Sequence, residues 1–100
     1  MTFKDEAEQL SPYIQEMRRH FHRHGELSFQ EKATTARIAE ELRPLGYDIQ
    51  TFPDYCGLIA TLRGPAPGRT VLLRADIDAL PLDEKTGADF ASENPGVMHA

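Results

Sequence analysis

The stretch Thr70–Leu82 (TVLLRADIDALPL) most constrains the fold, because it begins with an uninterrupted apolar run and ends in two aspartates one residue apart. The run Val71–Leu73 is typical of a strand buried on both faces of a parallel sheet. Side chains alternate along a strand, so Asp76 and Asp78 are expected to point to the same side. Ligands bind beyond the carboxyl ends of strands in open α/β sheets. The stretch therefore predicts a working site at these aspartates, although two acids that only cap a loop would give the same pattern.

The residues before this stretch predict a first helix. Apolar residues recur at steps of four and three from Phe3 to Phe21, which indicates one buried stripe. Pro12 falls inside that stripe. Either the helix kinks at Pro12, or Ser11 caps a second and longer helix that ends near His24.

A second helix and two strands follow the first helix. Ser28 and Glu31 match the S-x-x-E capping box of a helix that ends by Gly46. Asp48–Phe52 and Leu58–Arg63 read as strands, and GPAPG turns the chain into a third strand at the apolar run described above. The order helix, helix, strand, strand, strand predicts an open-sheet α/β architecture. Two helices cannot cover both faces of such a sheet, so we expect part of a larger domain.

Composition excludes several classes of function. The net charge of −5 argues against nucleic acid as a partner. No apolar run approaches the ~20 residues of a membrane span, so no membrane partner is expected. The acidic N-terminus resembles neither a secretory signal nor a transit peptide. Cys56 is the single cysteine, which excludes an internal disulfide and favours a cytoplasmic protein.

Cationic side chains crowd the end of the first helix. His20 and His24 are four residues apart on one face, which is a spacing that can bind a metal ion. Cations at a helix C-terminus are also favoured by the helix dipole, and three nearby arginines would repel a metal ion. The electrostatic interpretation is the stronger of the two.

Four segments resemble a known family. In order from about Ile14 to Ala100, MRRHFHRHGELSFQE, CGLIATLRG, LLRADIDALPLDE and GVMHA are similar to the aminoacylase and hippurate hydrolase group of metallopeptidase family twenty. The resemblance implies a metal-dependent amidohydrolase that cleaves the amide bond of N-acyl amino acids, which are small molecules. It implies two divalent metal ions, zinc or manganese, in a homodimer or larger homo-oligomer. Residues 1–100 would be the N-terminal portion of the catalytic domain, without the lid or dimerisation domain.

The resemblance gives two aspartates supporting roles. The wider family carries His-x-Asp at the strand end, and here Asp76 stands at the histidine position and Asp78 at the aspartate position. The metal ligands are expected in a Cys-Gly-His-Asp segment after Ala100, with His99 adjacent to it. No metal ligand is therefore expected within residues 1–100. This stretch alone is expected to hold no metal ion and to be inactive.

The resemblance also covers the end of the first helix, where the family pattern is His-x-x-Pro-Glu. His22 and Glu26 match this pattern, while Gly25 replaces the proline. We interpret His22 and Glu26 as a structural network at the helix end.

Two alternatives remain open on the sequence. DIDAL is similar to the D-x-D motif of magnesium-dependent phosphotransferases, although Ala79 departs from that motif. The chain could also be a non-catalytic piece whose exposed strand edges make it associate with other chains.

Overall fold

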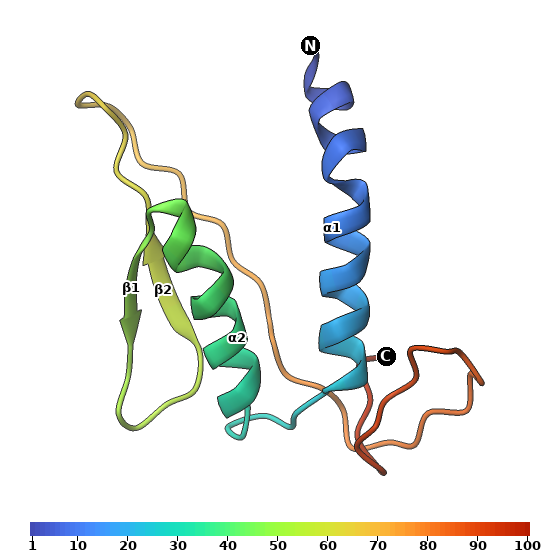
Figure 1. The fold of residues 1–100 in the computed structure, drawn as a ribbon. Coiled ribbons are helices and arrows are strands. Elements are labelled where there is room, and N and C mark those ends of the chain that lie inside the picture. Colours follow the sequence, from blue (N-terminus) through green and yellow to red (C-terminus); the bar gives the residue numbers. More distant parts are fainter.

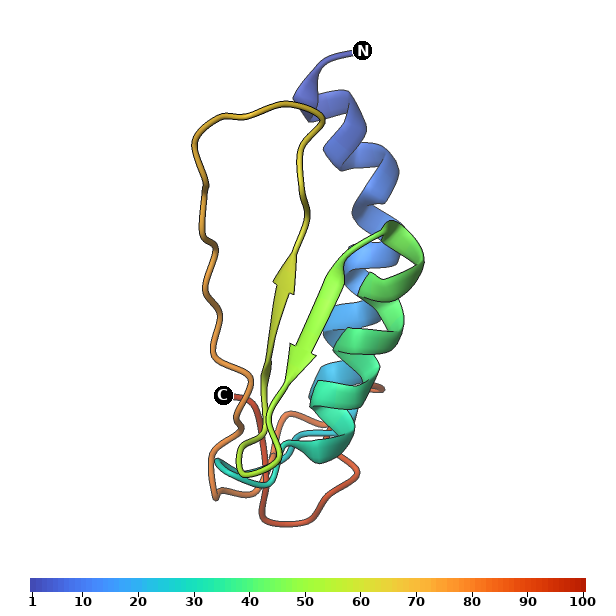
Figure 2. The ribbon, with the colours of Figure 1, turned by 90° about the vertical axis from the view of Figure 1, so that its left-hand side faces the viewer.

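A computed structural model describes all 100 residues, which form two helices and a two-stranded sheet (Figure 1). Helix α1 spans Phe3–Arg23 and helix α2 spans Lys32–Leu42, followed by a short 3-10 turn, η1, at Arg43–Leu45. Strands β1 (Asp48–Thr51) and β2 (Leu58–Thr61) pair in antiparallel fashion. Figure 1 shows α2 between the strands and α1, and Figure 2 shows both helices on one side of the strands. The α/β class predicted from the sequence is confirmed.

Helix α1 is continuous, with Pro12 inside it. Its N-terminus is closed by a capping box, in which the Asp5 amide donates to Thr2 Oγ1 at 3.2 Å and the Thr2 amide donates to Asp5 Oδ2 at 2.8 Å. The alternative of a separate helix capped by Ser11 is therefore wrong. A proline removes one helical hydrogen bond, and the helix continues past it on both sides.

The capping box predicted at Ser28 and Glu31 is also wrong. Glu31 is the residue before α2, and its side chain makes no capping hydrogen bond. The carboxylate of Glu26 caps the N-terminus of α2 instead. It accepts hydrogen bonds from the amide and the hydroxyl of Thr34, each at 2.6 Å, and from the Ala33 amide at 3.3 Å. A negative charge at this position satisfies the free amides and complements the helix dipole.

The predicted third strand does not form, which corrects both the three-strand order and the burial of the apolar run. Val71 and Leu72 are 83% exposed and Leu73 is 93% exposed. Their segment makes no backbone hydrogen bond until Ala79. Figure 2 shows it running back as extended chain on the β2 side of the hairpin. A strand needs neighbouring strands to pair with its backbone groups, and no strand of this chain pairs with the segment.

Burial is sparse throughout the chain. Only 5 of the 100 residues are buried, and the radius of gyration is 15.8 Å, against about 13 Å for a compact domain of this length. The apolar stripe of α1 contains no buried residue, and Phe3 at its start is 91% exposed. On α2 only Ala39 of the expected apolar face is fully buried. No helix combines the length and the apolar character that crossing a membrane requires.

Candidate functional site

Three segments that are distant in sequence meet at the C-terminal end of α1. Leu27, just after the helix, forms a parallel bridge with Ala79, whose amide donates to the Glu26 carbonyl at 2.7 Å. Leu80 and Met98 exchange two backbone hydrogen bonds, of 2.8 and 3.0 Å. The RADIDALP and GVMHA segments are therefore joined to each other and to the helix end. This junction is the candidate functional site.

The side chain of His99 packs against the helix end. A Cβ atom at Gly25 would lie 3.2 Å from the Ala79 Cβ and 3.4 Å from the His99 Cδ2, so only glycine fits without a shift of its neighbours. Burial lowers the pKa of His99 and the nearby His22 lowers it further, while the charge of Asp78 raises it. The His99 Nε2 atom is buried without a hydrogen-bond partner.

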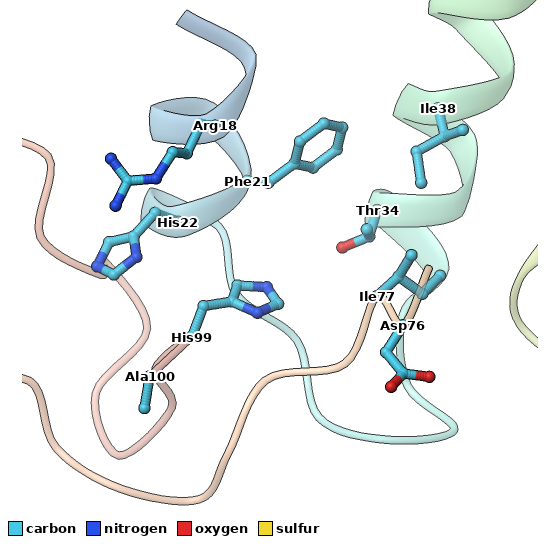
Figure 3. A pocket seen from close by; sticks show the side chains of 9 residues that line it. All are labelled: Arg18, Phe21, His22, Thr34, Ile38, Asp76, Ile77, His99 and Ala100. Atoms are coloured by element: carbon cyan, nitrogen blue, oxygen red, sulfur yellow. The ribbon is translucent and has the colours of Figure 1, made fainter. Parts of the chain in front are cut away.

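Asp76 lies apart from this contact. Its side chain is exposed, and its Oδ1 accepts a hydrogen bond from Arg74 Nη2 at 2.7 Å. It lines a pocket of about 500 Å³ between α1 and α2, together with Arg18, Phe21, His22, Thr34, Ile38, Ile77, His99 and Ala100. Figure 3 shows Asp76 on the opposite side of this pocket from Arg18. The next residue, Ile77, also lines the pocket, whereas Asp78 does not.

A nearly buried contact between a histidine and a glutamate is a feature that the sequence did not reveal. His22 Nε2 lies 2.6 Å from Glu84 Oε1, with side chains that are 16% and 4% exposed. Glu84 also accepts hydrogen bonds from the Thr86 hydroxyl and, at 2.9 Å, from the Ser92 amide. The Thr86 bond, followed by those from Ser92 and His22, holds the pKa of Glu84 below its ordinary value. The two partners are 62 positions apart, and no local pattern could have paired them.

The two other histidines of the helix end do not build a metal site. The rings of His20 and His24 are 4.7 Å apart between centroids, and Glu93 Oε2 lies 3.6 Å from His24 Nε2 at an exposed position. Burial and, next, the charge of Arg37 lower the pKa of His20. No three histidine, cysteine or acidic side chains of the chain are grouped so that they could hold a metal ion. The residues of this chain alone therefore do not fit a metal centre.

Comparisons with known proteins agree with the motifs. No protein-family model matches the chain. The N-acyl-L-amino acid amidohydrolase of Geobacillus stearothermophilus is 49% identical over 83 residues, which are 83% of this chain and 22% of that protein. Thermostable carboxypeptidase 1 of Saccharolobus solfataricus is 40% identical over 98 residues, which are 97% of this chain and 25% of that protein.

A solved structure extends the agreement to the fold. The YXEP protein of Bacillus subtilis, described as a dinuclear metal-binding peptidase of the M20 family, superposes with a TM-score of 0.84 at 41% identity. The match covers 92% of this chain and 26% of that one. This chain thus spans about a quarter of the length of the proteins it matches. Over the residues that it spans, the chain is similar in sequence and in fold to a peptidase of the M20 family, the family that its motifs resemble.

Proposed function

We propose that the protein containing these residues is a metal-dependent amidohydrolase that cleaves the amide bond of N-acyl amino acids, as aminoacylases and hippurate hydrolases do. The observation that carries this proposal is the 49% identity to an N-acyl-L-amino acid amidohydrolase. The junction supports it, because RADIDALP and GVMHA, two of the segments that resemble the family, are hydrogen-bonded to each other. The comparisons favour this reaction over the D-x-D phosphotransferase alternative.

Asp78 is proposed as a supporting residue of the active site. Its place in the segment whose Leu80 pairs with Met98, next to His99 in the chain, supports this role. A carboxylate that supports a metal ligand fixes the orientation of that ligand through a hydrogen bond or through its charge. Asp76 is proposed as a weaker contributor, because it is exposed and paired with Arg74.

Two divalent metal ions, zinc or manganese, are proposed as cofactors of the complete protein. The description of the M20 relative as dinuclear supports the number of ions. The residues of this chain do not group as a ligand set, so we propose that the ligands lie outside residues 1–100. The 100-residue chain alone is then expected to hydrolyse no N-acyl amino acid, and metal-dependent hydrolysis by the purified chain would contradict this.

Hydrolysis assays on the complete protein test the proposed function. N-acetyl and N-benzoyl amino acids are offered with Zn²⁺ or Mn²⁺, and a chelator is added in a parallel assay. We expect release of the free amino acid, and its loss on chelation. A metal-independent rate, or no hydrolysis with either metal ion, would refute the proposal.

Peptide hydrolysis is the second candidate function, because the carboxypeptidase of Saccharolobus solfataricus is 40% identical over nearly the whole chain. Both reactions cleave an amide bond next to a free amino-acid carboxylate. The same assay with unmodified dipeptides separates the two functions. A higher kcat/KM for dipeptides than for N-acetyl amino acids would favour the peptidase.

A further inference from the structure

We propose that His22 and Glu84 are positioning residues for the amide hydrolysis: their contact holds the loop 83–94 on the end of α1 and thereby fixes the segment Val97–Ala100 against Gly25. The inference rests on the proposed function for its catalytic consequence. The contact between His22 and Glu84 does not depend on the proposed function. His22 also lines the pocket between α1 and α2, whereas Glu84 does not. Both side chains are nearly buried, which is uncommon for a histidine and an acid on a protein surface.

Glu84 is the main attachment point of the loop. Its carboxylate is 4% exposed and accepts hydrogen bonds from three groups, one on α1 and two within the loop. A buried carboxylate is costly unless donors satisfy it. His22 is the one donor that comes from outside the loop, so removing it leaves the buried charge short of a partner.

Further contacts place the same loop against the same helix end. The Glu93 amide donates to the Arg23 carbonyl at 2.8 Å, and Asn94 Nδ2 donates to the Gly25 carbonyl at 2.7 Å. The ring of Phe90 packs edge-on against His22, with a centroid distance of 5.7 Å, and the guanidinium carbon of Arg19 lies 4.8 Å from its centroid. The loop is therefore seated on α1 by polar and aromatic contacts.

The loop leads directly into the junction. The Val97 amide donates to the Asn94 carbonyl at 3.2 Å, and Met98 pairs with Leu80 in the next step of the chain. His99 then packs on Gly25, which also contacts Ala79. A displacement of the loop would therefore move the segment that carries His99. A shift of about 1 Å in a supporting segment can lower a catalytic rate about 100-fold.

Variants of the complete protein test the inference with two readouts. His22→Leu removes the donor, whereas His22→Gln keeps a donor at nearly the same place. His24→Leu is the matched control, because His24 is two residues away at the C-cap of the same helix and its contact with Glu93 lies at an exposed position. The readouts are kcat and KM for an N-acetyl amino acid, and the rate of tryptic cleavage after Lys85, identified by mass spectrometry.

We expect His22→Leu to lower kcat about 10- to 100-fold, to change KM by less than about threefold, and to accelerate cleavage after Lys85. His22→Gln is expected to restore kcat to within about fivefold of the wild-type value. His24→Leu is expected to match the wild type in both readouts. Equal losses in His22→Gln and His22→Leu would overturn the role of the hydrogen bond.

The two readouts separate this inference from the proposed function. Unchanged cleavage after Lys85 in His22→Leu would overturn the attachment, whether or not the protein hydrolyses N-acyl amino acids. Faster cleavage with an unchanged kcat would overturn the positioning role. If His22→Leu does not fold, Glu84→Gln replaces it, with an expected three- to tenfold loss of kcat because a charge-assisted bond becomes a neutral one. Wild-type kcat and cleavage in Glu84→Gln would refute the inference.

Discussion

Removal of the Glu26 carboxylate should release the N-terminus of α2. Glu26→Ala deletes the acceptor of three hydrogen bonds, two of them to Thr34, which is 5% exposed. Loss of an N-terminal capping acceptor costs about 0.5–2 kcal/mol, and a buried donor left unsatisfied costs about 1–3 kcal/mol. The two terms describe the same hydrogen bonds and overlap, so we expect a loss of about 2–3 kcal/mol in the free energy of opening this helix end.

One further variant separates the contribution of the negative charge from that of the acceptor oxygen, and a second variant is the control. Glu26→Gln keeps an acceptor oxygen but loses the negative charge that favours a helix N-terminus, so we expect about 0.3–1 kcal/mol. Ser28→Ala is the control, because Ser28 is exposed and belongs to the capping box that the structure does not form. It should change the opening free energy by less than about 0.5 kcal/mol.

Hydrogen exchange of the Thr34 amide measures this free energy locally. The protection factor of that amide reports opening of the first turn of α2, and amides near the C-terminal end of α2 report whether the whole helix is lost. The reasoning is refuted if Ser28→Ala reduces protection of Thr34 as much as Glu26→Ala does. It is also refuted if Glu26→Ala leaves the protection unchanged.

Other predictions follow from individual contacts. The pKa of Glu84 is lowered chiefly by the Thr86 hydroxyl, so the stability that it contributes is present above its unfolded pKa, near 4.5, and is lost as the pH falls through the lower folded value; the protection factors of amides around Glu84 should decrease over this pH range, and protection factors that do not change with pH would contradict this. Tyr13→Phe should raise the pKa of Glu41, because the Tyr13 hydroxyl is the main cause of its lowering, and a carbon-13 titration of the Glu41 carboxyl that shows no shift would disprove it. Leu72→Lys should reduce self-association of the 100-residue chain in light scattering, because Leu72 is 83% exposed in an unpaired extended segment; unchanged scattering would count against that segment as the contact surface.

The elements defined by local patterns were predicted well from the sequence. The helical spacing of apolar residues identified both helices, and the alternating segments near 48–52 and 58–63 contain β1 and β2. Such patterns depend on residues that are close in the chain, so a single sequence contains them. Pro12 does not end the helix, because a capped helix of this length tolerates the one hydrogen bond that a proline removes.

The incorrect predictions concern long-range partners. The apolar run at 71–73 indicates that these residues favour burial, but not which strand would pair with them, and no strand of this chain does. Ser28 and Glu31 have the right spacing for a capping box, yet a carboxylate five residues before Glu31 reaches the helix end instead. The pairing of His22 with Glu84 likewise joins groups that only the folded chain brings together.

The junction differs from a conventional core in what holds it. Its segments are joined by backbone hydrogen bonds at Ala79, Leu80 and Met98 and by the nearly buried pair of His22 and Glu84, while the large apolar side chains of the chain remain exposed. Hydrogen bonds are directional and fix relative positions, whereas apolar burial is non-directional. Loss of one polar contact at this junction should therefore displace His99 relative to Gly25, and for this reason the His22 and Glu84 variants are read by kcat as well as by tryptic cleavage.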